Sequence, residues 1–151
     1  MIRRCSIMAG SEQGTSLVET AMLIFLLVLL LAGTIDFGRI YFLGNEVAGA
    51  AQAGAVYGSQ NITDTTGMTN AAKDDAPDVS GLMVTPSWGC ECSDGSQASA
   101  SCATTPTGCS ANVVYYATVT ASATYTTLFP WKGIPSSITI ARSATMRSTS
   151  E

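Results

Sequence analysis

The feature that most constrains this 151-residue chain is an apolar segment near its beginning, which carries a glutamate at its entrance. The residues from Thr20 to Ile35 carry no charge, but they number only sixteen, and crossing the hydrocarbon core of a bilayer takes roughly 20 predominantly apolar residues. If a partner neutralises Glu19, the uncharged stretch extends from Gln13 to Ile35 and becomes long enough. A carboxylate inside a membrane segment is costly and therefore indicates a function. We expect a membrane-spanning helix over about residues 17–38.

The charges that flank this segment predict its orientation. Arg3 and Arg4 precede it, whereas Asp36 and Arg39 follow it and cancel each other. The positive-inside rule then places the N-terminus in the cytoplasm and the rest of the chain outside. A cleaved secretory signal would share the basic start, but the following sequence IDFGRIYFL stays apolar and offers only a weak cleavage site. A plain membrane anchor leaves Glu19 unexplained.

The long helix is predicted to run over residues 15–58, apolar at first and then rich in small residues. Such residues allow another surface to approach a helix closely. That surface is a helix of another subunit, the chain's own sheet, or both on different faces of the helix. The candidate packing positions are Gly44, Ala48, Ala50, Ala51, Gly54, Ala55 and Gly58. Residues 59–81 are polar and predict a linker with a short helical turn near Thr69–Ala76.

The region from residue 82 to residue 151 is predicted to be β structure. From Val113 to Thr126, every second residue is Val, Ala or Tyr, and most of the residues between them are Thr or Ser, which is typical of a half-buried strand. Ser137–Met146 alternates in a similar way. Leu82–Trp88 is a shorter candidate, and Pro86 indicates an edge strand. We therefore expect an α+β fold, in which a small antiparallel sheet of about three strands is covered by the second half of the long helix.

The cysteines indicate disulfides and an oxidising compartment, because four of the five fall close together in a Ser/Thr/Gly-rich stretch. Zinc is disfavoured, since the chain has no histidine and Cys90-x-Cys92 is tighter than structural zinc pairs. Cysteines two residues apart rarely bond each other, so Cys90 and Cys92 should each pair with Cys102 or Cys109. A nested arrangement, Cys90–Cys109 with Cys92–Cys102, suits a hairpin loop. Cys5 is expected to be an inert thiol.

Composition argues against two classes of function. Seven scattered basic residues and a net charge of −4 give no patch for nucleic-acid phosphates. The chain also has no histidine, no nucleophile elbow, no phosphate loop and no paired carboxylates in a plausible site, so we expect neither an enzyme nor a cofactor. The loop Leu128–Pro135 is expected to close the small core, and an exposed contact with another subunit is the less favoured alternative.

The spacing of Gly14 and Glu19, ahead of a long apolar helix, resembles the prepilin processing site of type IV pilins. In that family a membrane aspartyl peptidase cuts after the glycine on the cytoplasmic side, and the glutamate becomes the fifth residue of the mature chain. The resemblance implies that residues 1–14 are a leader and that Thr15 becomes the new N-terminus. It also implies that Glu19 pairs with the N-terminus of a neighbouring subunit during assembly.

The resemblance becomes more specific after the apolar segment. The sequence DFGRIYF, which begins with Asp36, Phe37, Gly38 and Arg39, precedes the small-residue run NEVAGAAQAGAVYG. Together they are similar to the N-terminal region of TadE-like proteins, the pilin-like minor subunits of tight-adherence (Tad/Flp, type IVb) pilus systems. That family often has a proline in the apolar run, which this chain lacks, so a helix kink is not expected.

The resemblance implies a pilin-like fold and a structural role in assembling an adhesion pilus. It implies a place in the bacterial inner membrane, with the β region, residues 82–151, in the periplasm and incorporation into an extracellular pilus as a further option. The implied partners are the membrane, a prepilin peptidase, other pilin-like subunits and the pilus assembly machinery. The alternative is an unprocessed, single-pass, membrane-anchored binding or adhesion module of the cell envelope.

Overall fold

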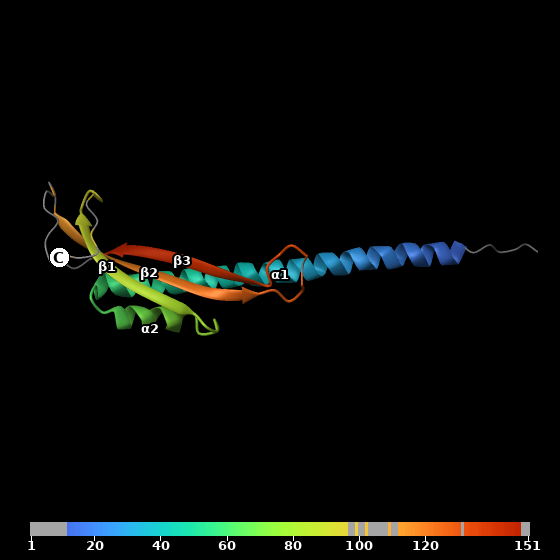
Figure 1. Ribbon diagram of the computed structural model, residues 1–151, viewed down its shortest axis with the longest axis horizontal. Coiled ribbons are helices and arrows are strands. Elements are labelled where there is room, and N and C mark those ends of the chain that lie inside the picture. The colour runs from blue at the N-terminus through green and yellow to red at the C-terminus, as the bar shows by residue number, and fades with distance from the viewer. Residues whose placement is uncertain are drawn as a thin grey trace, which may run out of the picture. The chain divides into compact units, whose positions relative to one another are not determined.

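The computed structural model describes residues 12–96, 99, 102, 109, 112–130 and 132–148, and two helices lie within these ranges. Helix α1 runs without interruption from Glu12 to Gln60, and α2 runs from Thr65 to Asp75 (Figure 1). The chain divides into two compact units, residues 1–37 and residues 38–151, and we call the second unit the head. Most of the expected leader, including Cys5, lies outside the described residues.

The head contains the three expected strands, β1 (Met83–Cys92), β2 (Val113–Thr126) and β3 (Ser137–Arg147). They form one antiparallel sheet in the order β1-β2-β3, so β2 is the central strand (Figure 1). Pro86 lies on β1, an edge strand of the sheet, opposite Val119. Proline has no N–H to donate, and an edge strand tolerates this where the backbone nitrogen faces away from the neighbouring strand. The α+β prediction is confirmed: the head part of α1 packs on a three-stranded antiparallel sheet.

The core lies between one face of the sheet and the two helices. On β2, Ala117, Val119, Ala121, Ala123 and Tyr125 are buried, as the period-two pattern predicted, while Thr124 on the other face is exposed. The buried core cluster consists of Val47, Ala50, Ala51, Ala55, Met68, Ala72, Ala76, Ala117, Val119, Ala121 and Ala123. Most of these side chains are small, so the helix backbone lies close to the strands.

Helix α2 is longer than the expected turn because Asp64 caps it. The Asp64 carboxylate accepts a hydrogen bond from the Gly67 N–H at 2.8 Å and another from the Tyr57 hydroxyl at 2.8 Å. Satisfying a free N–H of the first turn favours a start at Thr65, four residues before the predicted one. From α2, Met68 reaches the core and is fully buried.

The large apolar side chains described in the loop between β2 and β3 do not close the core, contrary to the prediction. Leu128, Phe129 and Ile134 are 55%, 44% and 52% exposed. The buried positions of β2 end at Tyr125, which is 5% exposed, and the head part of α1 already fills the space over the inner face. These three apolar side chains therefore remain at the surface.

Candidate processing site and assembly helix

The two residues of the expected processing site lie in the first turns of α1. The helix begins at Glu12, three residues before the predicted start, so Gly14 already has helical backbone. A Cβ placed on Gly14 would meet no atom within 4 Å, and the side chains of Thr15 and Glu19 are exposed. The Gly14–Thr15 peptide bond is thus open to approach from outside, within the first helical turn.

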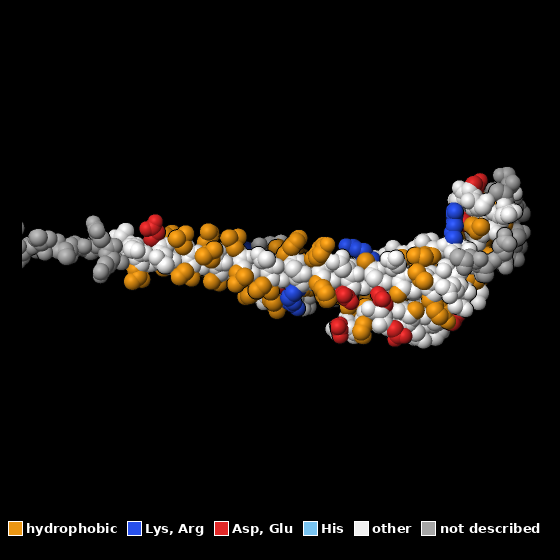
Figure 2. Space-filling view, turned by 180° about the vertical axis from the view of Figure 1, so that it is seen from behind, with side chains coloured by type: hydrophobic (Ala, Val, Ile, Leu, Met, Phe, Trp, Pro, Cys, Tyr) orange, Lys and Arg blue, Asp and Glu red, His pale blue; other side chains and the backbone are white. Residues whose placement is uncertain are grey.

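The segment that follows is apolar around its whole circumference. Every large hydrophobic side chain from Leu17 to Leu31 is between 46% and 73% exposed, and Figure 2 shows these side chains (orange) along the N-terminal part of α1. Within the described residues α1 is the one helix long and apolar enough to cross a membrane, with a mean hydropathy of 2.4 over its best window. A helix that is hydrophobic on all sides needs lipid or protein around it, and this one is consistent with a single-pass membrane anchor.

The other polar side chains of the apolar segment are satisfied within the helix. The hydroxyl groups of Thr20 and Thr34 donate hydrogen bonds to the carbonyl oxygens of Ser16 and Leu30, each at 2.8 Å. These local bonds reduce the cost of placing a hydroxyl in an apolar environment. Glu19 is then the one ionisable side chain between Gly14 and Ile35.

The DFGR motif lies where α1 enters the head. Asp36 is 7% exposed, whereas Phe37 is 73% exposed and a Cβ on Gly38 would meet no atom within 4 Å. The Arg39 guanidinium carbon lies 5.4 Å from the ring centroid of Tyr125, a distance typical of a cation–π contact. The sequence did not predict this contact. The one sequence feature that pointed to this contact was the position of Tyr125, which is the last inward-facing residue in the alternating pattern of β2.

The small residues of α1 face the chain's own sheet and α2. Ala50, Ala51 and Ala55 are at most 1% exposed. A Cβ on Gly54 would lie 2.9 Å from the carbonyl oxygen of Met68, and one on Gly58 would lie 2.6 Å from the Cβ of Ala117. Ala48 is half-buried, and Gly44 lies near the Arg142 guanidinium, 3.9 Å from the position of a Cβ. The chain's own sheet and α2 therefore occupy this face of α1.

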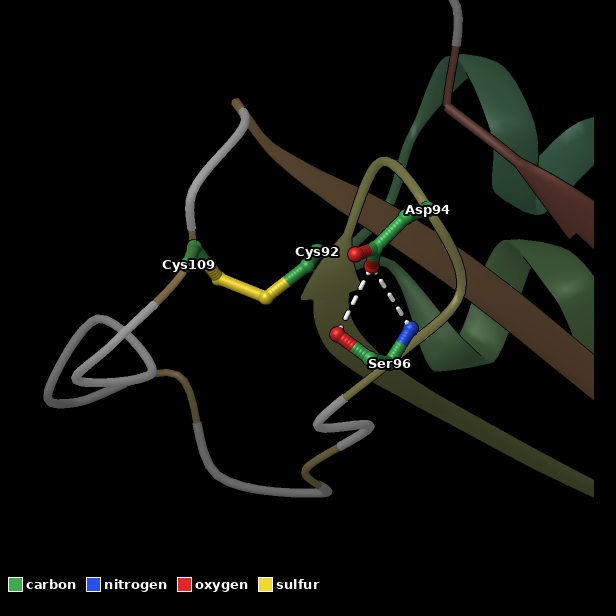
Figure 3. Close-up of a disulfide and its surroundings, with 4 residues drawn as sticks. All are labelled: Cys92, Asp94, Ser96 and Cys109. Carbon is green, nitrogen blue, oxygen red and sulfur yellow. Dashed lines mark hydrogen bonds between the residues drawn. A yellow bond between two sulfur atoms is a disulfide. The ribbon is translucent and has the colours of Figure 1, made fainter.

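The four clustered cysteines form two disulfides at the end of β1, Cys90–Cys102 and Cys92–Cys109, and Figure 3 shows the second of them. The predicted nested pairing is therefore wrong. The chain turns back beside Cys90, where Ser99 exchanges two backbone hydrogen bonds with it at 2.9 and 2.8 Å, and this brings Cys102 close.

Cys92 lies opposite Val113 in the ladder, and the Ser93 N–H donates to the carbonyl of Asn112, so the returning chain brings Cys109 to it. In the tight turn after β1, the Asp94 carboxylate accepts hydrogen bonds from the hydroxyl and the N–H of Ser96 (Figure 3). These bonds, the hydroxyl first, lower the pKa of Asp94. Among the residues that the structure describes, no three His, Cys, Asp or Glu side chains gather as a metal site would require.

Comparison with known proteins gives one match. No curated protein and no solved structure matches the chain significantly. The family described as TadE-like protein matches residues 14–56, from the glycine of the expected processing site through most of the head part of α1. Residues 14–56 are thus similar to the TadE-like family, and this segment contains Gly14, Glu19 and the DFGR motif, from which the resemblance was predicted.

Proposed function

We propose that this chain is a pilin-like minor subunit of a tight-adherence type IVb pilus. In this proposal α1 anchors it in the bacterial inner membrane, with its N-terminus in the cytoplasm and its head in the periplasm. The observation that carries the proposal is the family match that begins at Gly14 and places Glu19 at the entrance of an exposed apolar helix. TadE-like pilus proteins are structural, and the proposed role is assembly, not catalysis.

The chemistry of the proposal begins at the Gly14–Thr15 bond. A prepilin peptidase would hydrolyse this bond and leave an ammonium group on Thr15, one helical turn from Glu19. In the low-dielectric surroundings of a membrane or a helix bundle, an ammonium and a carboxylate attract each other strongly. Pairing of Glu19 with the Thr15 ammonium of a neighbouring subunit would fix the register between the two helices. This pairing explains the placement of Glu19 in an apolar segment.

The local structure of α1 is compatible with cleavage. A peptidase binds the scissile bond in an extended conformation, so the first turn of α1 has to unwind. The first four N–H groups of a helix have no partner within it, and this keeps the cost of unwinding low. Gly14 lowers it further, because glycine is unfavourable in a helix by roughly 0.5–1 kcal/mol relative to alanine.

The decisive experiment is to determine the N-terminus of the chain after co-expression with its cognate prepilin peptidase. We expect the chain to begin at Thr15, as measured by N-terminal sequencing and intact mass. A Gly14→Leu variant is the control, because its bulky side chain should block cleavage and leave the chain uncut. Recovery of the uncut chain from the wild type would favour the unprocessed membrane-anchored module, and a start after Ile35 would favour a secretory signal.

A further inference from the structure

Within the head, α1 keeps one face uncovered, on the side that turns away from the sheet. Tyr41 and Val56 are 66% and 40% exposed, and Asn45 and Gln52 are exposed as well. Because an α-helix turns by about 100° per residue, these four side chains point within an arc of about 60°. They form one continuous strip along the helix, which we call the open stripe.

Arg142 borders one side of the open stripe. It lies on β3 opposite the buried Ala121 of β2, so its side chain extends from the face of the sheet that α1 covers. There the guanidinium reaches α1, and a Cβ on Gly44 would lie 3.9 Å from its Nη2 atom. Its Nη1 atom donates a hydrogen bond to the carbonyl oxygen of Ala141 at 3.0 Å. Among the described residues, no carboxylate forms an ion pair with Arg142.

Asp75 borders the other side of the open stripe. It is the last residue of α2, and α2 contacts β1, which lies at the opposite edge of the sheet from β3. A Cβ on Gly49 would lie 2.9 Å from the Oδ2 atom of Asp75, so this carboxylate lies against α1. It also lines an open groove of about 500 Å³ between the two helices, together with Gln52 and Val56 of the open stripe.

The structure of the head does not itself account for the charge of Asp75. Its side chain is exposed, and within the described part of the chain nothing donates a hydrogen bond to it. A carboxylate in the last turn of a helix is also unfavourable, because the helix dipole already places negative charge there. The stability of α2 therefore gives no reason for a carboxylate at this position.

The two charges lie on opposite sides of the open stripe and at different levels. Gly44 and Gly49 are five residues apart, which corresponds to about 140° around the helix and about 7.5 Å along its axis. The whole open stripe falls inside this arc. The uncovered face of α1 thus has a cation along one border and a carboxylate along the other.

The rest of the head divides its charge in the same way. Asp74 and Asp78 are exposed at the end of α2 and after it, and Lys73 is the one basic residue of the segment 65–80. The sequence has no carboxylate side chain between Asp94 and Glu151, so β2 and β3 contribute only positively charged side chains. In Figure 2 most of the acidic side chains of the head (red) gather along one edge. The α2 side is therefore acidic and the β3 side is basic.

We propose that the heads of neighbouring copies of this chain contact each other through these two borders, with Arg142 of one copy paired to Asp75 of the next. Borders of opposite charge make the surface complementary to a second copy of itself. Copies placed around a common axis, with their open stripes toward it, bring the two borders together. The inference rests on the membrane anchoring and assembly of the proposed function, but not on processing or on Glu19.

This contact is of the head-to-tail kind. Copies that cross one membrane in the same orientation have parallel helices. Each copy is then displaced from the last by about 7.5 Å along α1, the difference in level between the two charges. The outer copies keep one Arg142 and one Asp75 unused, so further copies can add.

The test is self-association of the full, uncut chain in phosphatidylcholine liposomes, whose neutral surface attracts neither charge. The measurement is energy transfer between copies that carry a donor or an acceptor fluorophore at the C-terminus. Confinement to one membrane raises the effective concentration of the copies, so a weak contact becomes measurable. The wild type should show transfer that an excess of unlabelled chain removes, and wild-type chain without such transfer would overturn the inference.

Charge reversal identifies the two side chains. Arg142→Glu and Asp75→Lys should each abolish the transfer, because like charges would then meet across the contact. A mixture of donor-labelled Arg142→Glu and acceptor-labelled Asp75→Lys should restore it, because the new carboxylate of one variant meets the new ammonium of the other. The unchanged Asp75 and Arg142 of these two variants remain complementary as well. A mixture that associates no better than each variant alone would contradict the proposed pair.

Two controls complete the experiment. Lys132→Glu changes the net charge by as much as Arg142→Glu, at an exposed position of the loop after β2, and it should leave the transfer unchanged. An equal loss with Lys132→Glu would show general repulsion between the copies and overturn the inference. Both border side chains are exposed, so their variants should keep the melting temperature of the wild type.

Flotation of the liposomes separates this inference from the proposed function. If the chain floats with the liposomes and the two reversals leave the transfer unchanged, the inference alone fails. If the chain does not float, the membrane anchoring fails and the inference fails with it.

Discussion

Glu19 makes the sharpest prediction at the scale of single residues. Glu19→Ala and Glu19→Gln should leave membrane insertion intact, because each makes the segment less polar, but both should abolish surface pili. The physical reason is that the Thr15 ammonium of the neighbouring subunit would lose its partner charge at a helix contact. The measurement is piliation and adherence in a strain with each variant as its sole copy.

A control for this experiment removes a different carboxylate from the same helix. Glu46 lies in the head part of α1, after the apolar segment. Glu46→Gln should therefore allow normal piliation. Full piliation with both Glu19 variants would show that this carboxylate has no part in assembly.

A second prediction at this scale concerns Gly58, where there is no room for a methyl group. Gly58→Ala would place a Cβ 2.6 Å from that of Ala117 and 2.9 Å from the Met68 Cε. Overpacking costs about 1–3 kcal/mol, and the gain in helix propensity offsets up to about 1 kcal/mol of it, so the free energy of unfolding should fall by about 1–2 kcal/mol.

The matched control is Gly38→Ala on the same helix, where a Cβ would meet nothing within 4 Å. It should raise the free energy of unfolding by about 0.5–1 kcal/mol. Both values would come from denaturant unfolding of the full chain in detergent. Equal effects of the two variants would contradict the close approach of α1 to β2.

At the scale of elements, the cap of α2 predicts a pH dependence. The pKa of Asp64 is lowered, first by the hydrogen bond from the Gly67 N–H and then by that from the Tyr57 hydroxyl. A carboxyl group whose pKa is lower in the folded state than its ordinary value of 3.8 stabilises the fold at pH values above 3.8. This stabilisation is lost as the pH falls through the lowered pKa of the folded state.

The expected outcome is that Asp64→Ala lowers the melting temperature at neutral pH and flattens its fall below about pH 4. Asp64→Asn is the control, because asparagine also caps helices well. It should retain most of the melting temperature at neutral pH while it lacks the acid-dependent change. Parallel melting curves for the wild type and Asp64→Ala across this range would contradict the cap.

The disulfides at the end of β1 give a second prediction for an element. Loops closed by Cys90–Cys102 and Cys92–Cys109 have sequence separations of 12 and 17. Removing either bridge should cost about 3 kcal/mol on the chain-entropy model. The measurement is the unfolding free energy together with a count of free thiols.

The paired substitution Cys92→Ser with Cys109→Ser should leave the free-thiol count of the wild type unchanged. The mismatched pair Cys92→Ser with Cys102→Ser removes one cysteine from each bridge. It should therefore disrupt both bridges and lower the stability further. If the mismatched pair proves to be the more stable variant, the nested pairing would be correct after all.

At the scale of the whole molecule, the sequence predicted the elements whose pattern is local. The alternation of apolar and polar residues identified β2 and β3, because successive residues of a strand face opposite sides of the sheet. The apolar run identified the membrane-compatible part of α1, and the spacing of Gly14 and Glu19 indicated the family. The Asp64 cap was missed, although Asp is a preferred N-cap residue, so the helical turn was predicted to begin four residues too late.

What the sequence could not predict depends on contacts between distant segments. The cysteine pairing follows from the bridge between Cys90 and Ser99, which no local pattern reveals. The exposure of Leu128 and Phe129 depends on how much of the inner sheet face α1 covers. The contact of Arg39 with Tyr125 joins residues 86 positions apart in the sequence, counted from 39 to 125.

The small core side chains also affect how this protein can change during evolution. Ala50, Ala55, Ala117 and Ala121 are fully buried, and almost every substitution at an alanine adds atoms. In a core of large residues, a larger side chain at one position can be compensated by a smaller one at a neighbouring position. In this core the neighbours are already small, so such compensation is hardly available. We expect a saturation mutagenesis library, selected for piliation, to retain chiefly Gly, Ser or Ala at these positions. Sequence drift should instead collect on the outward, hydroxyl-bearing face of β2, where Thr124 lies.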